Sequence, residues 1–218
     1  TPDWIHHADD RDHPGDEAEA ALGFRYSSQY IGFCELRRVR PGKPVKINWE
    51  LMSSRDGRHW HRPLRQLFFA DGPAESWRYQ VFKIFANAPI EHDGKLWIYY
   101  GGKTGTVPVD KGDKPFQAVG LAQLRRDGFV SLDASQKGGH VLTKPILVFG
   151  DTLQLNVAVS QGGFAKVAVI GKDGKPVRGV GLADCVPLKG DGIEQAVNWR
   201  SKADLGTLTG RPVQLRIE

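Results

Sequence analysis

The chain has 218 residues, of which 40% are hydrophobic and 10% aromatic, so it can bury the core of one large domain or two modest ones and is not a disordered chain. No apolar run is long enough to span a bilayer, and the first residues lack the apolar segment of a signal peptide, so we expect no membrane association. The net charge of +5 includes a basic cluster at residues 36–46, but no nucleic-acid-binding module accompanies it, so we expect a solvated basic surface and no nucleic-acid partner.

The first strands are expected soon after an acidic N-terminal segment. Residues 1–20 are polar and suit a loop, although the Ala and Glu residues of 15–24 would also suit a helix. From about residue 22 the hydrophobic pattern has a period of two, and "FRYSSQYIGFCEL" (24–36) predicts two short strands joined at Ser27 and Ser28. In "VKINWELM" (45–52) apolar and polar residues alternate, which is typical of a half-buried strand.

Asp-Gly pairs at 56–57, 93–94 and 127–128 mark hairpin turns, because glycine tolerates the positive φ that such turns require. Trp60 and Trp97 each follow one of these turns. A tryptophan in this place can wedge between adjacent sheets, and repeated four-stranded sheets packed face to face are the blades of a propeller. The alternative is that both tryptophans belong to the core of a β-sandwich, and the pattern alone does not separate the two.

The pattern changes after about residue 133, where strands recur roughly every ten residues with turn signals between them, which indicates a β-sandwich. We therefore predict an all-β fold, with partial β-propeller-like blades over residues 1–132 and a β-sandwich over residues 133–218. Cys34 and Cys185 stand far apart in apolar strands, so we expect two buried free thiols, no disulfide and no metal site built from cysteine.

Five stretches of this chain resemble one known family. Four of them are "SSRDGRHWHRP" (53–63), "APIEHDGKLWIYYGG" (88–102), "AVGLAQLRRDGFVSLDA" (118–134) and "GGHVLTKPI" (138–146), and the fifth, residues 155–191, resembles the C-terminal sandwich of that family. They resemble the later part of bacterial five-bladed propeller glycosidases, of the type that includes the β-fructosidases and arabinanases, which continue into a C-terminal β-sandwich. The likeness covers most of residues 25–217. It implies a glycoside hydrolase-like protein that acts on polysaccharides or oligosaccharides through paired carboxylates and without a cofactor, and it favours a secreted or periplasmic location.

The chain also departs from that family in length. Only about 130 residues precede the predicted sandwich, whereas five blades need roughly 250–300 residues. The chain is then a fragment, a shortened relative, or one whose exposed sheet edges pair with a second copy, and we hypothesise a homodimer. The missing length supports a second function, that of a non-catalytic carbohydrate-binding module. A serine esterase ranks below both, because the chain has no Gly-x-Ser-x-Gly elbow.

The resemblance places a carboxylate near Asp16, at the start of a blade, and Glu91 precedes a predicted inner strand. We predict Asp16 and Glu91 as the catalytic pair, with Asp12 as a substitute for Asp16. Arg25 and His92 are expected to support the bound sugar with polar contacts. For each acid, the alternative is a solvated loop carboxylate with no catalytic role.

The chain has more aromatic rings than two hairpin cores need. The C–H faces of sugar rings stack on aromatic side chains, so Trp77, Tyr79 and Trp97 are predicted to bind substrate. The alternative is that these rings pack between blades.

The segment "HHADDRDH" (6–13) contains nitrogen and oxygen donors of the kind that transition metals prefer, with His6, His13 and Asp10 as the candidate ligands. Such a loop arises by chance, and no supporting groups are visible, so we predict no metal. His59 and His61 alternate along a strand, and an exposed position is the preferred interpretation there too.

Overall fold

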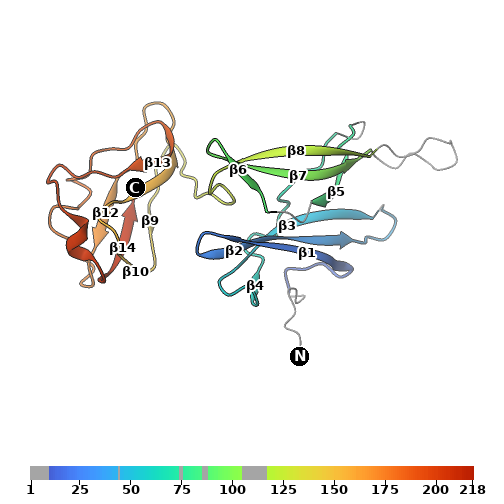
Figure 1. The fold of residues 1–218 in the computed structure, drawn as a ribbon, viewed down its shortest axis with the longest axis horizontal. Helices are drawn as coiled ribbons and strands as arrows, with labels where there is room; N and C mark the ends of the chain where they lie inside the picture. Colours follow the sequence, from blue (N-terminus) through green and yellow to red (C-terminus); the bar gives the residue numbers. More distant parts are fainter. Residues whose placement is uncertain (1–9, 44, 74–75, 85–87, 105–116) are drawn as a thin grey trace. The chain divides into compact units, whose positions relative to one another are not determined.

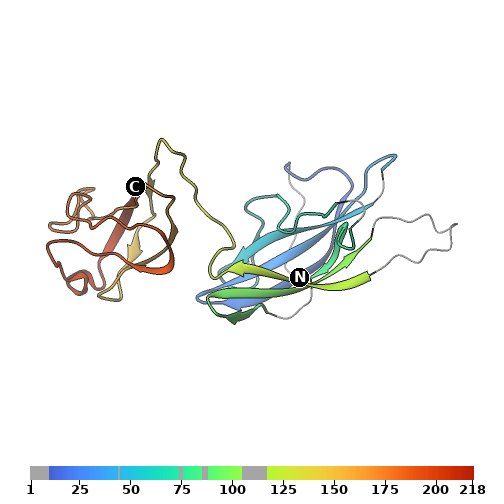
Figure 2. The same cartoon turned by 90° about the horizontal axis from the view of Figure 1, so that it is seen from above.

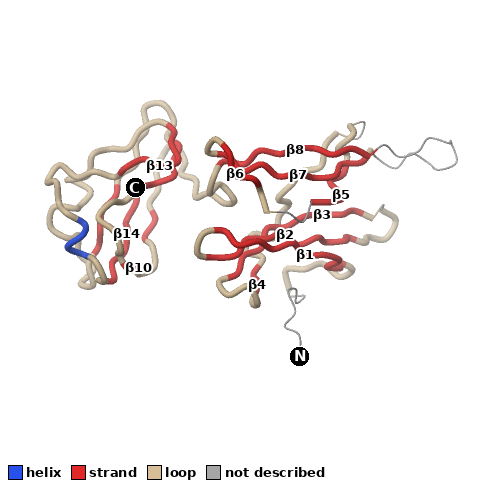
Figure 3. Tube along the Cα trace, in the orientation of Figure 1, coloured by secondary structure: helices blue, strands red, loops and turns tan. Residues whose placement is uncertain are grey.

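The structure is a computed structural model that describes residues 10–43, 45–73, 76–84, 88–104 and 117–218. The predicted all-β fold class is confirmed: the described residues form antiparallel sheets, and the helical structure among them is one short 3₁₀ turn, Leu205–Leu208 (Figure 3). The chain divides into two compact units, residues 1–129 and residues 130–218. Among the described residues, no helix is long and apolar enough to cross a membrane.

Unit 1 begins with an antiparallel sheet in which each strand pairs with the next along the chain. Its strands are β1 (Asp16–Tyr26), β2 (Gln29–Arg38), β3 (Lys46–Ser54) and β4 (Trp60–His61) (Figure 1). The predicted turn at Ser27 and Ser28 is confirmed, with Ser27 at a φ of 53°. The possible helix over 15–24 is wrong, because β1 starts at Asp16 and pairs along its length with β2, and this pairing outweighs the local preference of Ala and Glu.

The second sheet of unit 1 is built around the long strand β7 (Lys95–Lys103). Two shorter strands, β5 (Gln80–Ile84) and β6 (Ile90–His92), pair with different halves of one edge of β7, and β8 (Gln117–Arg125) pairs with the other edge. The predicted Asp-Gly turn between β6 and β7 is confirmed, since Asp93 and Gly94 have φ values of 51° and 67°. This turn sets which β6 side chains face the core.

The two sheets of unit 1 pack face to face. In Figure 1 they form two layers, and in Figure 2 the green strands of the second sheet overlie the blue and cyan strands of the first. The apolar core between them draws on β2, β3, β5 and β7, with Phe33, Trp49, Leu51, Ile84, Ile98 and Tyr100 among its buried members. Neighbouring propeller blades and the two layers of a sandwich both pack in this way.

The tryptophans that follow Asp-Gly turns do not fill this core. Trp60 lies on the opposite face of the first sheet, where its ring covers Gly23 and Gly32 and contacts a small buried cluster with Met52. Trp97 alternates with buried Leu96 and so faces away from the core of the second sheet. The prediction that these residues wedge between the sheets is wrong, and Trp49 occupies that place instead.

Unit 2 also has two sheets around one core. One sheet joins β9 (Val141–Leu142), β10 (Ile146–Leu147) and β12 (Val167–Ile170) to β14 (Pro212–Ile217), and the other pairs β11 (Gln154–Ala158) with β13 (Asp191–Ala196). Trp199 and the strand residues Val167 and Val169 are buried in the core that they share. Cys34 in unit 1 and Cys185 in unit 2 are both buried and free, as predicted.

Candidate functional site

Unit 1 contains a cavity of about 470 Å³ where β1 ends and the β6–β7 hairpin begins. Its lining includes two carboxylates, two guanidinium groups and a phenol, and we call it the Glu91 pocket. The polar groups belong to Glu91, Asp127, Arg25, Arg126 and Tyr26, and apolar atoms of Phe24, Pro89 and Leu96 line much of the rest.

Local backbone structure positions these groups. Glu91 lies directly opposite Leu96 in the β6–β7 hairpin, and opposite residues of an antiparallel pair share a face. Because Leu96 is buried, the Glu91 side chain is directed to the inner side of the sheet. Asp127 follows β8 with a φ of 61°, a left-handed conformation that Asp adopts more readily than most residues.

Tyr26 and Asp127 form a reciprocal pair that joins the two sheets at the pocket. The Tyr26 hydroxyl donates to Asp127 Oδ1 at 2.8 Å and accepts from the Asp127 backbone N–H at 3.2 Å. Burial, followed by the hydrogen bond to the Asp127 carboxylate, raises the pKa of Tyr26 to about 12. The phenol therefore remains protonated at neutral pH.

Arg126 lies between the two carboxylates of the pocket. Its Nη1 is 3.4 Å from Glu91 Oε1, and its Nε is 3.9 Å from Asp127 Oδ2. These distances are longer than those of a tight charge-assisted hydrogen bond, and about half of each carboxylate side chain is exposed. The carboxylate oxygens are thus accessible to hydroxyl donors of a bound molecule.

The structure brings two of the predicted site residues together and separates others. Glu91 and Arg25 both line the Glu91 pocket. His92 is exposed and alternates with Glu91 along β6, so it faces the other side of the sheet. Asp16 starts the strand that Tyr26 ends, about 30 Å away by the rise of an extended strand. Asp16 and Glu91 are therefore too far apart to act on one glycosidic bond within this unit.

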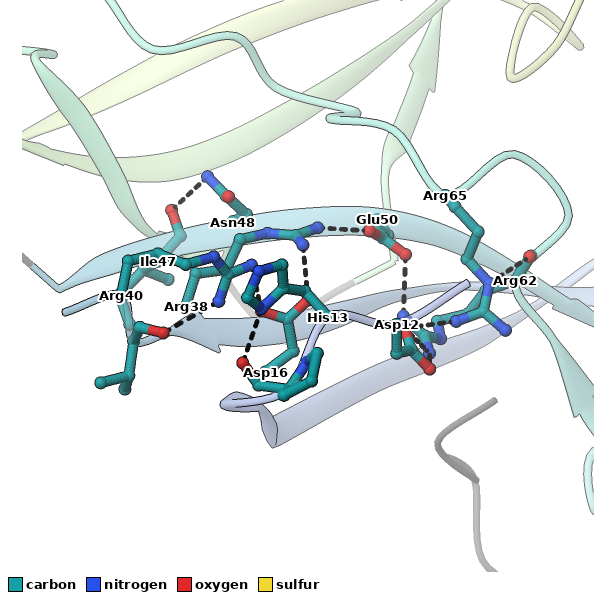
Figure 4. A network of polar contacts seen from close by, with 12 residues as sticks. Asp12, His13, Asp16, Arg38, Arg40, Ile47, Asn48, Glu50, Arg62 and Arg65 are labelled. Atoms are coloured by element: carbon teal, nitrogen blue, oxygen red, sulfur yellow. Dashed lines mark hydrogen bonds and ion pairs between the residues drawn. The ribbon is translucent and has the colours of Figure 1, made fainter. Parts of the chain in front are cut away.

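Asp16 and Asp12 instead belong to a buried chain of alternating charges, which we call the arginine–carboxylate chain (Figure 4). Arg38 joins Asp16 to Glu50, with N–O distances of 2.7 and 2.6 Å. Arg62 joins Glu50 to Asp12, at 2.9 and 2.7 Å. Arg40 pairs with Asp16 at one end, and Arg65 pairs with Asp12 at the other, both at 2.6 Å.

Each carboxylate of the arginine–carboxylate chain lies between two guanidinium groups. The side chains of Glu50 and Arg62 are 2% and 3% exposed, and those of Asp16 and Asp12 are similarly buried. Burial alone would lower the pKa of Arg62, but the hydrogen bond to Asp12 and the charge of Glu50 raise it. Paired in this way, the three carboxylates anchor β1, β3 and the segment around Arg62 to one another.

The predicted aromatic residues are divided between packing and exposed positions. Trp77 stacks on Tyr100, with ring centroids 5.9 Å apart, and covers Gly102 and Gly120 on the core side of the second sheet. The ring of Tyr79 lies beneath the ammonium group of Lys46 at 5.6 Å. Trp97 is half-buried on the outer face of the second sheet, and its Nε1 is 3.4 Å from the carbonyl oxygen of His92.

The metal prediction falls partly outside the described residues, because His6 is not among them. In the part of the chain that the structure describes, no three histidine, cysteine or acidic side chains are grouped to hold a metal ion. His13 Nδ1 is 2.6 Å from the Pro14 carbonyl oxygen. His59 pairs with Asp56 at 2.6 Å, and the hydrogen bonds that Asp56 accepts, the one from the His59 ring first, lower its pKa.

A second cavity of about 440 Å³ lies between the two sheets and has a mostly apolar lining, which includes Phe68, Phe69 and Phe129. Its described lining contains no carboxylate, so the Glu91 pocket is the better candidate for binding a hydroxyl-rich molecule.

Comparison with known proteins gives no match: neither a family model, nor a curated protein, nor a solved structure is similar to this chain. The resemblance to propeller glycosidases therefore stays a prediction, and functional inference depends on the geometry of the site.

Sequence reasoning missed Asp127, Tyr26 and Arg126 as site residues. The sequence pattern explains Asp127 by the Asp127–Gly128 turn and Tyr26 by its place at the end of a predicted strand. The signal that could have found Tyr26 is position, because it directly precedes the Ser27–Ser28 turn, just as Glu91 lies two residues before the Asp93–Gly94 turn. Side chains at strand ends reach the rim of a two-sheet core, where pockets form.

Proposed function

We propose that unit 1 binds carbohydrate in the Glu91 pocket. The observation that carries this proposal is the lining of the pocket, in which the carboxylates Glu91 and Asp127 stand beside Arg25, Arg126 and the ring of Tyr26. Carboxylates accept hydrogen bonds from sugar hydroxyls, guanidinium groups donate to hydroxyl and ring oxygens, and the aromatic ring covers a C–H face. The volume of about 470 Å³ suits a mono- or disaccharide unit.

Glycoside hydrolysis is the second candidate, favoured by the presence of two carboxylates beside one arginine. In this form of the proposal Glu91 and Asp127 take the roles first assigned to Glu91 and Asp16. A hydrolase needs one carboxylate as acid and the other as base or nucleophile, with a separation that fits a single glycosidic bond. Arg126 lowers the cost of holding two carboxylates in one pocket.

The test is a titration of the whole chain with a panel of neutral and acidic oligosaccharides, together with a reducing-sugar assay on the same panel. We expect saturable binding that weakens at least tenfold in Glu91→Ala, a loss of about 1.4 kcal/mol. Glu17→Ala is the matched control, because Glu17 is an exposed carboxylate that pairs with Arg37 near the opposite end of β1. Binding without turnover supports the binding module, and turnover lost in both Glu91→Ala and Asp127→Ala supports the hydrolase. If no sugar binds the unmodified chain, the proposal fails.

A further inference from the structure

The outer face of the second sheet of unit 1 is apolar along its middle. Tyr99 pairs with Leu121 and Gly101 pairs with Val119, so these side chains lie on one face, and Ile90 of β6 is opposite Trp97 on the same face. The side chains of Ile90, Tyr99, Val119 and Leu121 are 42% to 66% exposed. A contiguous exposed patch of this kind marks a binding surface more often than scattered apolar residues do.

Among the strand residues that the structure describes, the basic side chains on this outer face have no acidic neighbour on the same face. Lys95 and Lys103 stand at the two ends of β7. Both are an even number of residues from Tyr99, so they face the same side of the sheet as Tyr99, and His92 lies opposite Lys95. Glu91 is the one carboxylate in strands β5 to β8, and it faces the opposite side of the sheet. Lys95 Nζ donates to Gln123 Oε1 at 3.1 Å, a neutral partner that leaves its charge uncompensated.

We infer that this outer face is a second binding surface, for a polyuronate chain, and this inference rests on the proposed carbohydrate-binding function. The rings of Tyr99 and Trp97 cover the C–H faces of the sugar units, while Lys95 and Lys103 pair with their carboxylates. The two lysines are about 27 Å apart along β7, which spans several sugar rings. A chain with one carboxylate on each ring offers both the apolar faces and the spaced charges that this surface needs.

Charge separates this occupant from a second copy of the chain. A two-fold dimer through this face would bring lysines of one copy against lysines of the other, and strands β5 to β8, as the structure describes them, place no carboxylate on this face to compensate for them. A polyuronate chain avoids this repulsion between like charges, because its carboxylates pair with the lysines.

The experiment measures the affinity of the whole chain for hexagalacturonate and for its fully methyl-esterified form, which keeps the rings and removes the charges. We expect the acidic oligomer to bind at least fivefold more tightly than the ester, with an affinity that falls as salt rises. Tyr99→Ala and the double variant Lys95→Gln/Lys103→Gln should each weaken hexagalacturonate binding at least fivefold. Lys172→Gln, an exposed lysine in unit 2, is the control and should bind as the unmodified chain does.

Circular dichroism of each variant confirms folding, and the Lys→Gln pair tests the surface even if Tyr99→Ala folds poorly. The inference is overturned if both surface variants bind as the unmodified chain does, if the ester binds as tightly as the acid, or if a single-stranded oligonucleotide binds as tightly as hexagalacturonate. If Glu91→Ala loses hexagalacturonate binding while both surface variants keep it, the proposed function of the Glu91 pocket stands and only the inference about the outer face fails. Concentration-dependent dimerisation lost in Tyr99→Ala would assign the face to a second copy instead.

Discussion

Glu50 shows how little the polarity of one residue says about its environment. It lies on the polar side of an alternating strand, where the sequence predicts solvent, yet its side chain is 2% exposed. Arg38 and Arg62 each bind one of its oxygens, at 2.6 and 2.9 Å. Both faces of β3 are therefore buried, one against the apolar core and the other in the arginine–carboxylate chain.

Glu50→Gln removes the central negative charge from this chain. We expect the free energy of unfolding of unit 1 to fall by about 3 kcal/mol, because the buried guanidinium group of Arg62 and the partly buried one of Arg38 lose a shared charged partner. Chemical denaturation followed by tryptophan fluorescence measures the change. Glu17→Gln, which affects an exposed ion pair with Arg37, should cost less than about 1 kcal/mol. Equally small losses of unfolding free energy in the two variants would show that the arginine–carboxylate chain stabilises unit 1 no more than an exposed ion pair does.

Tyr26 gives a prediction about alkaline pH. The unfolded chain ionises this phenol near its ordinary pKa of 10.0, and the folded chain ionises it near 12, so the unfolded state loses the proton first. The stability of unit 1 should therefore be insensitive to Tyr26 below about pH 10 and should fall as pH rises from 10 to 12.

The phenolate absorbance of the folded protein and its denaturation midpoint, measured together across this range, test the pKa of Tyr26. Tyr26→Phe should lower the free energy of unfolding by about 1 kcal/mol at neutral pH, because the hydrogen bond to Asp127 is missing. The variant should also lack the fall in stability that ionisation of Tyr26 causes at alkaline pH. A normal phenolate titration for all tyrosines would contradict the prediction.

At the scale of single elements, hairpins could be predicted from the sequence and long-range ion pairs could not. Ser27–Ser28 and Asp93–Gly94 were recognisable because turn chemistry and strand alternation are local. Asp12 and Arg62 are fifty residues apart in the chain, and nothing in their neighbours indicates the contact. The Glu91 pocket could be predicted only in part for the same reason. Glu91 and Arg25 are polar residues close to local turns, whereas the contact between Tyr26 and Asp127 joins residues that are 101 positions apart in the chain.

The β7–β8 pair depends on glycine for its packing. A Cβ atom at Gly120 would lie 2.4 Å from the Tyr100 ring and 2.6 Å from the Trp77 ring. We expect Gly120→Ala to lower the free energy of unfolding by about 1–3 kcal/mol, because the two stacked rings must move. Val119 is the neighbouring residue and faces the exposed side of the sheet, so Val119→Thr should change the free energy of unfolding by no more than about 0.5 kcal/mol. Comparable losses of unfolding free energy in the two variants would mean that β8 tolerates no substitution here, whether or not the new side chain meets the two rings.

At the scale of the whole molecule, the chain is two β structures in series, each with its own core. The core of unit 2 is made from residues between Val148 and Ile217, and every strand from β9 to β14 pairs within that unit. The closing strand β14 is central, since β9, β10 and β12 all pair with it. The strand pairing of unit 2 therefore depends on its last residues.

We expect residues 130–218 alone to fold and to unfold in one cooperative transition, because the fragment keeps every strand pair and the whole apolar core of unit 2. Near-ultraviolet circular dichroism of Trp199, which donates from Nε1 to the Val167 carbonyl at 3.0 Å, reports its native packing. A second fragment, 130–210, lacks β14 and should be unfolded, since β12 then has no partner for its length. If 130–218 is unfolded, or if 130–210 retains the same signal, unit 2 is not an independent folding unit centred on β14.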